Sequence, residues 1–135
     1  MNSPVAVLDA SALLAYLQGE PGAERVAEVL VLGAAISSVN WAETLTKLAD
    51  RGQDPETVAT QLSDLGLLNK TLLVYPVDES LARKIAQLRL PTRSEGLSLG
   101  DRACLALASQ LKKPALTTDR AWNSLNLAVE IRLIR

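Results

Sequence analysis

The chain has 135 residues, a formal net charge of −1, no histidine and one cysteine, Cys104. This length is enough for one domain with its own hydrophobic core, and a hydrophobic content of 48% excludes a disordered chain. The missing histidines exclude a Ser-His-Asp triad, a histidine zinc site and histidine acid–base catalysis, and the lone cysteine excludes an internal disulfide framework.

We find no apolar run long enough to span a membrane and no signal-peptide pattern at the amino terminus. A single cysteine is typical of a reducing compartment. We therefore expect one soluble, cytoplasmic domain that covers residues 1–135 and has no membrane association.

In chain order, the apolar run at residues 4–8 predicts a buried strand, and Asp9 follows this strand directly. Similar runs of β-forming residues predict further strands at residues 34–39, 71–75, 114–118 and 128–134. Apolar residues at helical spacing, together with capping residues, predict helices at residues 11–17, 22–31, 40–50, 55–65, 79–88 and 99–111. An exposed loop is expected at 90–97 and a short helical turn at 119–125.

Strands alternate with helices along the whole chain, which is typical of a parallel sheet covered by helices. We therefore expect an α/β fold, a three-layer α/β/α sandwich with a parallel sheet of four to five strands. The first strand is expected to lie beside a later strand at a switch point, where their carboxyl ends open one crevice. If the fourth strand is that neighbour, Asp9 and Asp119 face each other across the crevice.

Four carboxylates share a placement at this predicted edge of the sheet. Asp9 and Asp119 each end a strand, and Glu43 and Asp101 each fall in the first turn of a predicted helix. Each acid taken singly is also explained as a helix cap, and the pairs Asn40…Glu43 and Ser98…Asp101 fit the capping-box spacing. As a group, such carboxylates stay ionised only if a cation lies among them, and oxygen ligands select Mg²⁺ or Mn²⁺.

A divalent ion in this position would activate a water molecule for attack on a phosphodiester. Ser11 and Thr117 lie two residues from Asp9 and Asp119, where their hydroxyls could hold carboxylates or waters in place. The alternative role of both hydroxyls is ordinary hydrogen bonding at a helix start and a strand end.

Charge is unevenly divided along the chain. Residues 1–80 carry 4 basic and 11 acidic side chains, a net charge of −7, whereas residues 81–135 carry 10 basic and 4 acidic ones, a net charge of +6. The later part could supply an electropositive surface, although solvated helix faces explain the same pattern. Candidate contacts to a phosphodiester backbone are Arg89, Arg93, Arg102 and Arg120.

The four acidic segments resemble the four motifs of PIN-domain ribonucleases, and most of all those of VapC-type toxins from toxin–antitoxin pairs. The segments are Val-Leu-Asp9-Ala-Ser11, Asn40-Trp-Ala-Glu43, Leu99-Gly-Asp101-Arg-Ala and Leu116-Thr-Thr-Asp119-Arg. They follow the family's order and span most of the chain. The resemblance implies a Mg²⁺- or Mn²⁺-dependent endoribonuclease whose catalytic metal ligands are Asp9, Glu43, Asp101 and Asp119. It also implies a homodimer that is held inactive by a cognate antitoxin protein.

Three alternatives remain open at this point. A haloacid-dehalogenase-like phosphatase would use Asp9 as its nucleophile, but such enzymes carry a second aspartate where this chain has Ser11. A receiver-type domain would need a phosphorylated aspartate after the third strand, where this chain has Pro76. A catalytically inactive binding module with the PIN fold is the third.

Overall fold

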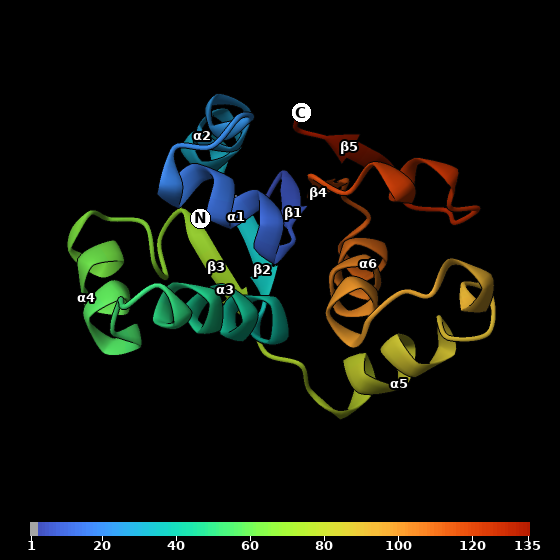
Figure 1. Ribbon diagram of the computed structural model, residues 1–135. Helices are drawn as coiled ribbons and strands as arrows, with labels where there is room; N and C mark the ends of the chain where they lie inside the picture. Colours follow the sequence, from blue (N-terminus) through green and yellow to red (C-terminus); the bar gives the residue numbers. More distant parts are fainter. Residues whose placement is uncertain (1–2) are drawn as a thin grey trace.

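The computed structural model describes residues 3–135, which are built around a sheet of five parallel strands (Figure 1). The strands are β1 (Ala6–Leu8), β2 (Ala34–Ser37), β3 (Leu72–Tyr75), β4 (Ala115–Thr117) and β5 (Ile131–Leu133), in the spatial order β3-β2-β1-β4-β5. The chain moves outward from β1 to β3 and then returns to β4 on the other side of β1. The structure thus shows that β4 is the strand beside β1 at the expected switch point.

Six α-helices connect and cover the strands: α1 (Ala10–Gln18), α2 (Ala23–Leu32), α3 (Ser38–Asp50), α4 (Pro55–Asp64), α5 (Glu79–Gln87) and α6 (Leu99–Leu111). Two 3₁₀ turns, η1 (Arg93–Glu95) and η2 (Arg120–Ser124), follow α5 and β4. The turn η2 matches the predicted helical turn, whereas η1 lies inside the segment that we expected to be an irregular loop. The predicted three-layer α/β/α architecture is confirmed.

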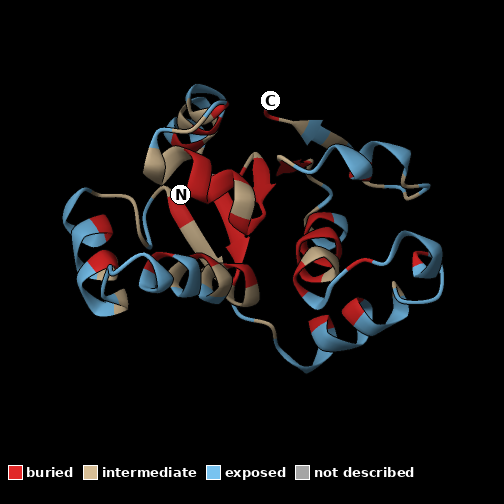
Figure 2. Ribbon diagram, viewed as in Figure 1, coloured by how far each residue is buried: buried red, intermediate tan, exposed pale blue. Residues whose placement is uncertain are grey.

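Alternating side chains of the strands point into the two layers of helices. Val7 and Ala115 pack in one core with α5 and α6, whereas Leu8 and Leu116 pack in another with α1 and α2. Because both faces of the sheet are covered, its central strands are apolar as far as their carboxyl ends, where Ser37 and Thr117 lie. Figure 2 shows this buried centre in red, with exposed residues on the outer faces of the helices.

The helix α3 lies at the carboxyl ends of the strands, where it contacts both α1 and α6. Leu48 on its inner side packs in a third small cluster with Leu14 of α1 and with Val58 and Leu62 of α4. The start of α3 therefore faces the same edge of the sheet as the starts of α1 and α6.

The position of the α3 start corrects one sequence-based prediction. We expected a helix that begins at Asn40 with a capping box to Glu43, but α3 begins at Ser38 and Ser37 is its N-cap. The Ser37 hydroxyl oxygen accepts a hydrogen bond from the Asn40 backbone N–H at 3.0 Å. Ser37 thus already satisfies the third amide of the helix, so Glu43 lies in the second turn and is not a capping residue.

Among residues 3–135, no helix is both long and apolar enough to cross a membrane.

Candidate active site

Asp9 is the most deeply buried of the four predicted acids, with 7% of its surface exposed. It follows β1 and caps α1, where one carboxylate oxygen accepts from the Ala12 backbone N–H at 2.8 Å and from the Ser11 hydroxyl at 2.7 Å. The other oxygen accepts from the Thr117 hydroxyl at 2.5 Å. Asp9 is therefore the N-cap of α1, and its carboxylate is also held in place by two neighbouring hydroxyl groups.

Burial raises the pKa of the Asp9 carboxyl from 3.8 to about 6, because the ionised form loses its hydration. The hydrogen bonds from Thr117, Ser11 and Ala12 lower this pKa, whereas the nearby Asp101 carboxylate raises it further. These hydrogen bonds stabilise the ionised form without fully offsetting the desolvation. A cation beside Asp9 would supply the stabilisation that is still missing.

Ser11 and Thr117 join the ends of β1 and β4. The Ser11 hydroxyl oxygen accepts from the Thr118 backbone N–H at 3.0 Å, and the Thr117 hydroxyl oxygen accepts from the Asp119 backbone N–H at 3.1 Å. Each hydroxyl also donates to Asp9, so the two side chains fix its carboxylate relative to the segment that carries Asp119. Ser11 thus contacts the acid that lies two residues before it, whereas Thr117 donates to Asp9, which lies on a different strand end from the neighbouring Asp119.

Asp101 lies in the first turn of α6, where the predicted capping box is present. Its carboxylate accepts from the Ser98 backbone N–H at 3.0 Å, and its own N–H donates to the Ser98 hydroxyl oxygen at 3.1 Å. Asp119 is the exposed N-cap of η2 and accepts from the Ala121 N–H at 3.0 Å. Both acids thus have a structural role in addition to their position at the edge of the sheet.

Glu43 reaches this edge from α3. Its carboxylate accepts a hydrogen bond from the Asn40 side-chain amide at 2.8 Å, and it lies against the Cα of Gly100 in α6. The role expected for Asn40 was helix capping, but the structure shows it holding Glu43.

The four predicted acids line one pocket of about 340 Å³ at the carboxyl ends of β1 and β4. The pocket residues are Asp9, Ala10, Ser11, Asn40, Glu43, Lys47, Asp101, Thr118 and Asp119. Beneath it lies Cys104, whose thiol pKa is raised by burial and then by the charges of Asp9, Asp101 and Glu43. Four segments far apart in the chain therefore bring their carboxylates to the lining of one pocket.

The chemistry of these side chains suits a hard divalent cation, because all four charged donors are carboxylate oxygens. Within residues 3–135, however, no three Asp, Glu or Cys side chains lie close enough together to form a metal centre as they stand. Ionised carboxylates that share one pocket repel one another unless a cation offsets their charge.

Sequence reasoning missed three residues of this site: Asn40 as a partner of Glu43, Gly100 as its packing surface, and Lys47. Lys47 is the one cation among the residues that line the pocket. Its position four residues after Glu43, on the same face of α3, was a signal that could have identified it.

The four arginines proposed for RNA binding do not line the pocket. Arg89, Arg93 and Arg120 are exposed. Arg102 is half-buried and points toward α5, where its guanidinium donates to the Ile85 carbonyl oxygen at 3.1 Å. Arg102 is thus the least accessible of the four to a ligand.

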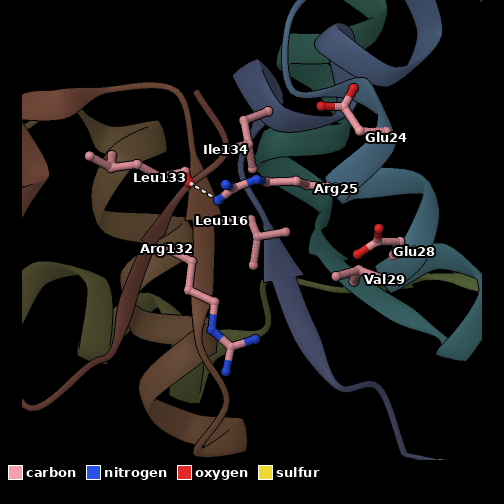
Figure 3. Close-up of a pocket in the computed structure, with 8 residues that line it drawn as sticks. All are labelled: Glu24, Arg25, Glu28, Val29, Leu116, Arg132, Leu133 and Ile134. Carbon is pink, nitrogen blue, oxygen red and sulfur yellow. Dashed lines mark hydrogen bonds between the residues drawn. The ribbon is translucent and has the colours of Figure 1, made fainter.

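A second pocket, of about 470 Å³, lies between α2 and the β4–β5 edge of the sheet (Figure 3). Its charged residues are Glu24, Arg25, Glu28 and Arg132, all of which are exposed. The Arg25 guanidinium donates to the Leu133 carbonyl oxygen at 3.3 Å and so ties α2 to β5 (Figure 3). None of the predicted site residues lies in this pocket.

Comparison with known proteins gives one family match and a set of similar folds. The family model of the PIN domain matches residues 6–126, a range that includes all four acids. A search of curated proteins gave no match.

Among solved structures, a toxin–antitoxin complex from Klebsiella pneumoniae is 20% identical, with a TM-score of 0.71 over 96% of this chain and 98% of that chain. The sarcin–ricin loop cleaving toxin VapC20 of Mycobacterium tuberculosis is 18% identical, with a TM-score of 0.71 over 93% of this chain and 98% of that chain. DNA-bound VapBC from Salmonella typhimurium is 16% identical, with a TM-score of 0.72 over 98% and 100% of the two chains. At these identities the likeness shows a shared fold.

Proposed function

This chain belongs to the PIN domain family, and we propose that it is a Mg²⁺- or Mn²⁺-dependent endoribonuclease that acts as the toxin of a toxin–antitoxin pair. The observation that carries the proposal is the meeting of Asp9, Glu43, Asp101 and Asp119 in one pocket at the switch point of the sheet. Family membership favours a nuclease over the phosphatase and receiver alternatives. Ser11 also argues against the phosphatase, and Pro76 argues against the receiver domain.

In this proposal the four carboxylates hold the divalent ion. When bound, the ion would act as a Lewis acid and would lower the pKa of a water molecule that attacks the phosphodiester. Ser11 and Thr117 keep the Asp9 carboxylate in one orientation by donating to its two oxygens. The ion would also offset the desolvation that raises the pKa of Asp9, so Asp9 would remain ionised.

RNA would approach an acidic pocket, so cations near it are needed to reduce repulsion of the phosphates. Lys47 lines the pocket, and the exposed Arg89, Arg93 and Arg120 lie in the basic second half of the chain. We propose that some of these cations contact the RNA backbone, a contribution that weakens as salt rises.

Partners are proposed from the fold. Similar folds occur in toxin–antitoxin complexes, in some of which DNA is bound. We propose a cognate antitoxin protein that blocks the pocket and a homodimer as the form of the free toxin. Co-expression with the adjacent reading frame should restore growth if this frame encodes the antitoxin, and sedimentation of the purified chain gives its oligomeric state.

The test of the activity is induction of the wild-type chain and of Asp9→Asn in growing cells, followed by mapping of RNA 5′ ends. We expect new, defined RNA ends and growth arrest with the wild type only. The purified wild type should reproduce the cleavage with Mn²⁺ or Mg²⁺ and lose it with EDTA. Full activity of Asp9→Asn would refute the mechanism. A correctly folded wild type that neither binds Mn²⁺ nor cleaves RNA would support a binding module instead.

A further inference from the structure

Asn40 is a buried side chain whose hydrogen bonds all lie within the protein. Only 1% of its surface is exposed. Its amide nitrogen donates to a Glu43 carboxylate oxygen at 2.8 Å and to the Gly100 carbonyl oxygen at 2.9 Å. Its amide oxygen accepts from the Ser37 hydroxyl at 2.6 Å. A buried amide that is satisfied in this way is held in one rotamer.

Only one orientation of the Asn40 amide meets these contacts. A backbone carbonyl oxygen and an ionised carboxylate can only accept, so the amide nitrogen must face Gly100 and Glu43. The Ser37 hydroxyl accepts from the Asn40 backbone N–H and is therefore free to donate to the amide oxygen. The network thus runs from the end of β2 through Asn40 to the first turn of α6.

Gly100 supplies the space that Glu43 occupies. A Cβ atom built on Gly100 would lie 2.6 Å from the Glu43 carboxyl carbon, closer than any carbon contact in a folded protein allows. Any larger residue at position 100 would therefore displace the carboxylate. Gly100 is not needed for an unusual backbone conformation, because it lies within the regular helix α6.

We propose that Asn40 and Gly100 are positioning residues that set the Glu43 carboxylate in the acidic pocket. Asn40 fixes the carboxylate by a hydrogen bond on one side, and the bare Cα of Gly100 admits it on the other. Because Asn40 also bonds to the Gly100 carbonyl, the same contacts set the distance between α3 and the helix that carries Asp101. The proposal rests on the proposed function only in assigning Glu43 to metal binding.

The first experiment measures Mn²⁺ binding by calorimetry for the wild type, Asn40→Ala and Gly100→Ala. Partners that orient metal ligands typically change metal affinity by 10- to 100-fold, so we expect the Kd of each variant to rise about tenfold or more. Thr44→Val is the matched control, because Thr44 is a fully buried α3 residue whose hydroxyl donates to the Asn40 backbone carbonyl and not to the Glu43 carboxylate. The control should keep the wild-type Kd.

Gly100→Ala also tests whether a higher Kd results from unfolding of the protein. Alanine stabilises a helix interior more than glycine does, so this change should not weaken α6 itself. Circular dichroism and urea unfolding of all variants check that they are folded. Wild-type Kd values in folded Asn40→Ala and Gly100→Ala proteins would overturn the proposal.

A second experiment, without metal, separates this proposal from the proposed function. Each variant is combined with Glu43→Ala, and urea midpoints are compared in a double-mutant cycle. Gly100→Ala should change the midpoint less favourably when Glu43 is present than when Glu43 is truncated, because only the intact carboxylate must move to make room for the new Cβ. Additive effects would refute the positioning role, whether or not the wild type binds Mn²⁺. Absence of Mn²⁺ binding by the wild type, with non-additive effects, would instead refute the metal assignment of the site.

Discussion

Replacement of Asp9 by asparagine should stabilise the metal-free protein at neutral pH. Burial raises the Asp9 pKa from 3.8 to about 6, and one pKa unit corresponds to about 1.4 kcal/mol, so ionised Asp9 destabilises the fold by about 3 kcal/mol. Asparagine removes this cost and keeps a good N-cap oxygen for α1. It also removes the oxygen that accepts from the Thr117 hydroxyl, which costs about 1 kcal/mol or somewhat more.

The net expectation is a gain of about 1 to 2 kcal/mol in the free energy of unfolding at pH 7.5 with EDTA. The gain should depend on pH with a defined sign. Between pH 6 and pH 4 the folded wild type binds a proton at Asp9 that the unfolded chain does not, so wild-type stability rises as the pH falls. At pH 5 the advantage of the variant should therefore shrink by about 1 kcal/mol.

The assay is urea unfolding of both proteins at pH 7.5 and pH 5. Asp54→Asn is the matched control, because Asp54 is an exposed N-cap of α4 that is remote from the pocket. Its stability should change by less than about 0.5 kcal/mol, since asparagine and aspartate are equally good caps. The reasoning would be refuted if Asp9→Asn were no more stable than the wild type at pH 7.5. It would also be refuted if the difference in the free energy of unfolding were the same at both pH values, because the cost would then not come from a buried ionised carboxylate.

Three further changes test other parts of the site. Thr117→Val removes a donor to ionised Asp9, so the Asp9 pKa should rise further; the pH profile of cleavage should shift to higher pH, and an unshifted profile would contradict this role. Ser98→Ala removes half of the capping box on α6 and should lower the free energy of unfolding by about 1 kcal/mol in urea, while an unchanged midpoint would show that the cap contributes little. Arg120→Ala should lower kcat/KM at low salt and reduce the slope of log kcat/KM against log salt by about one unit if this arginine contacts a phosphate; an unchanged slope would exclude that contact.

The architecture and the four acids followed from local patterns. Alternating strands and helices predicted the parallel α/β sandwich, because hydrophobic periodicity and capping act over a few residues. The Ser98–Asp101 capping box is an example, since its two hydrogen bonds join residues three positions apart. The order of the motifs was enough to predict the family that residues 6–126 match.

The role of Asn40 could not be predicted in this way. Its spacing to Glu43 fitted a capping box, but Ser37 takes the capping position, and the amide of Asn40 bonds to Gly100, 60 residues further along the chain. A contact between α3 and α6 depends on how the helices pack, which spacing within one helix does not determine.

Asp9 shows the same difference between what local sequence patterns predict and what depends on packing. The sequence by itself determined that an aspartate follows a buried strand and that its side chain caps the next helix. It also determined that three further acids occupy similar positions. Only the tertiary structure decided that β4 lies beside β1, that Thr117 donates to Asp9, and that helices cover this carboxylate closely enough to raise its pKa to about 6. Desolvation arises from the atoms that pack around a group, and in this fold those atoms come from segments more than a hundred residues apart, as the Thr117–Asp9 bond shows.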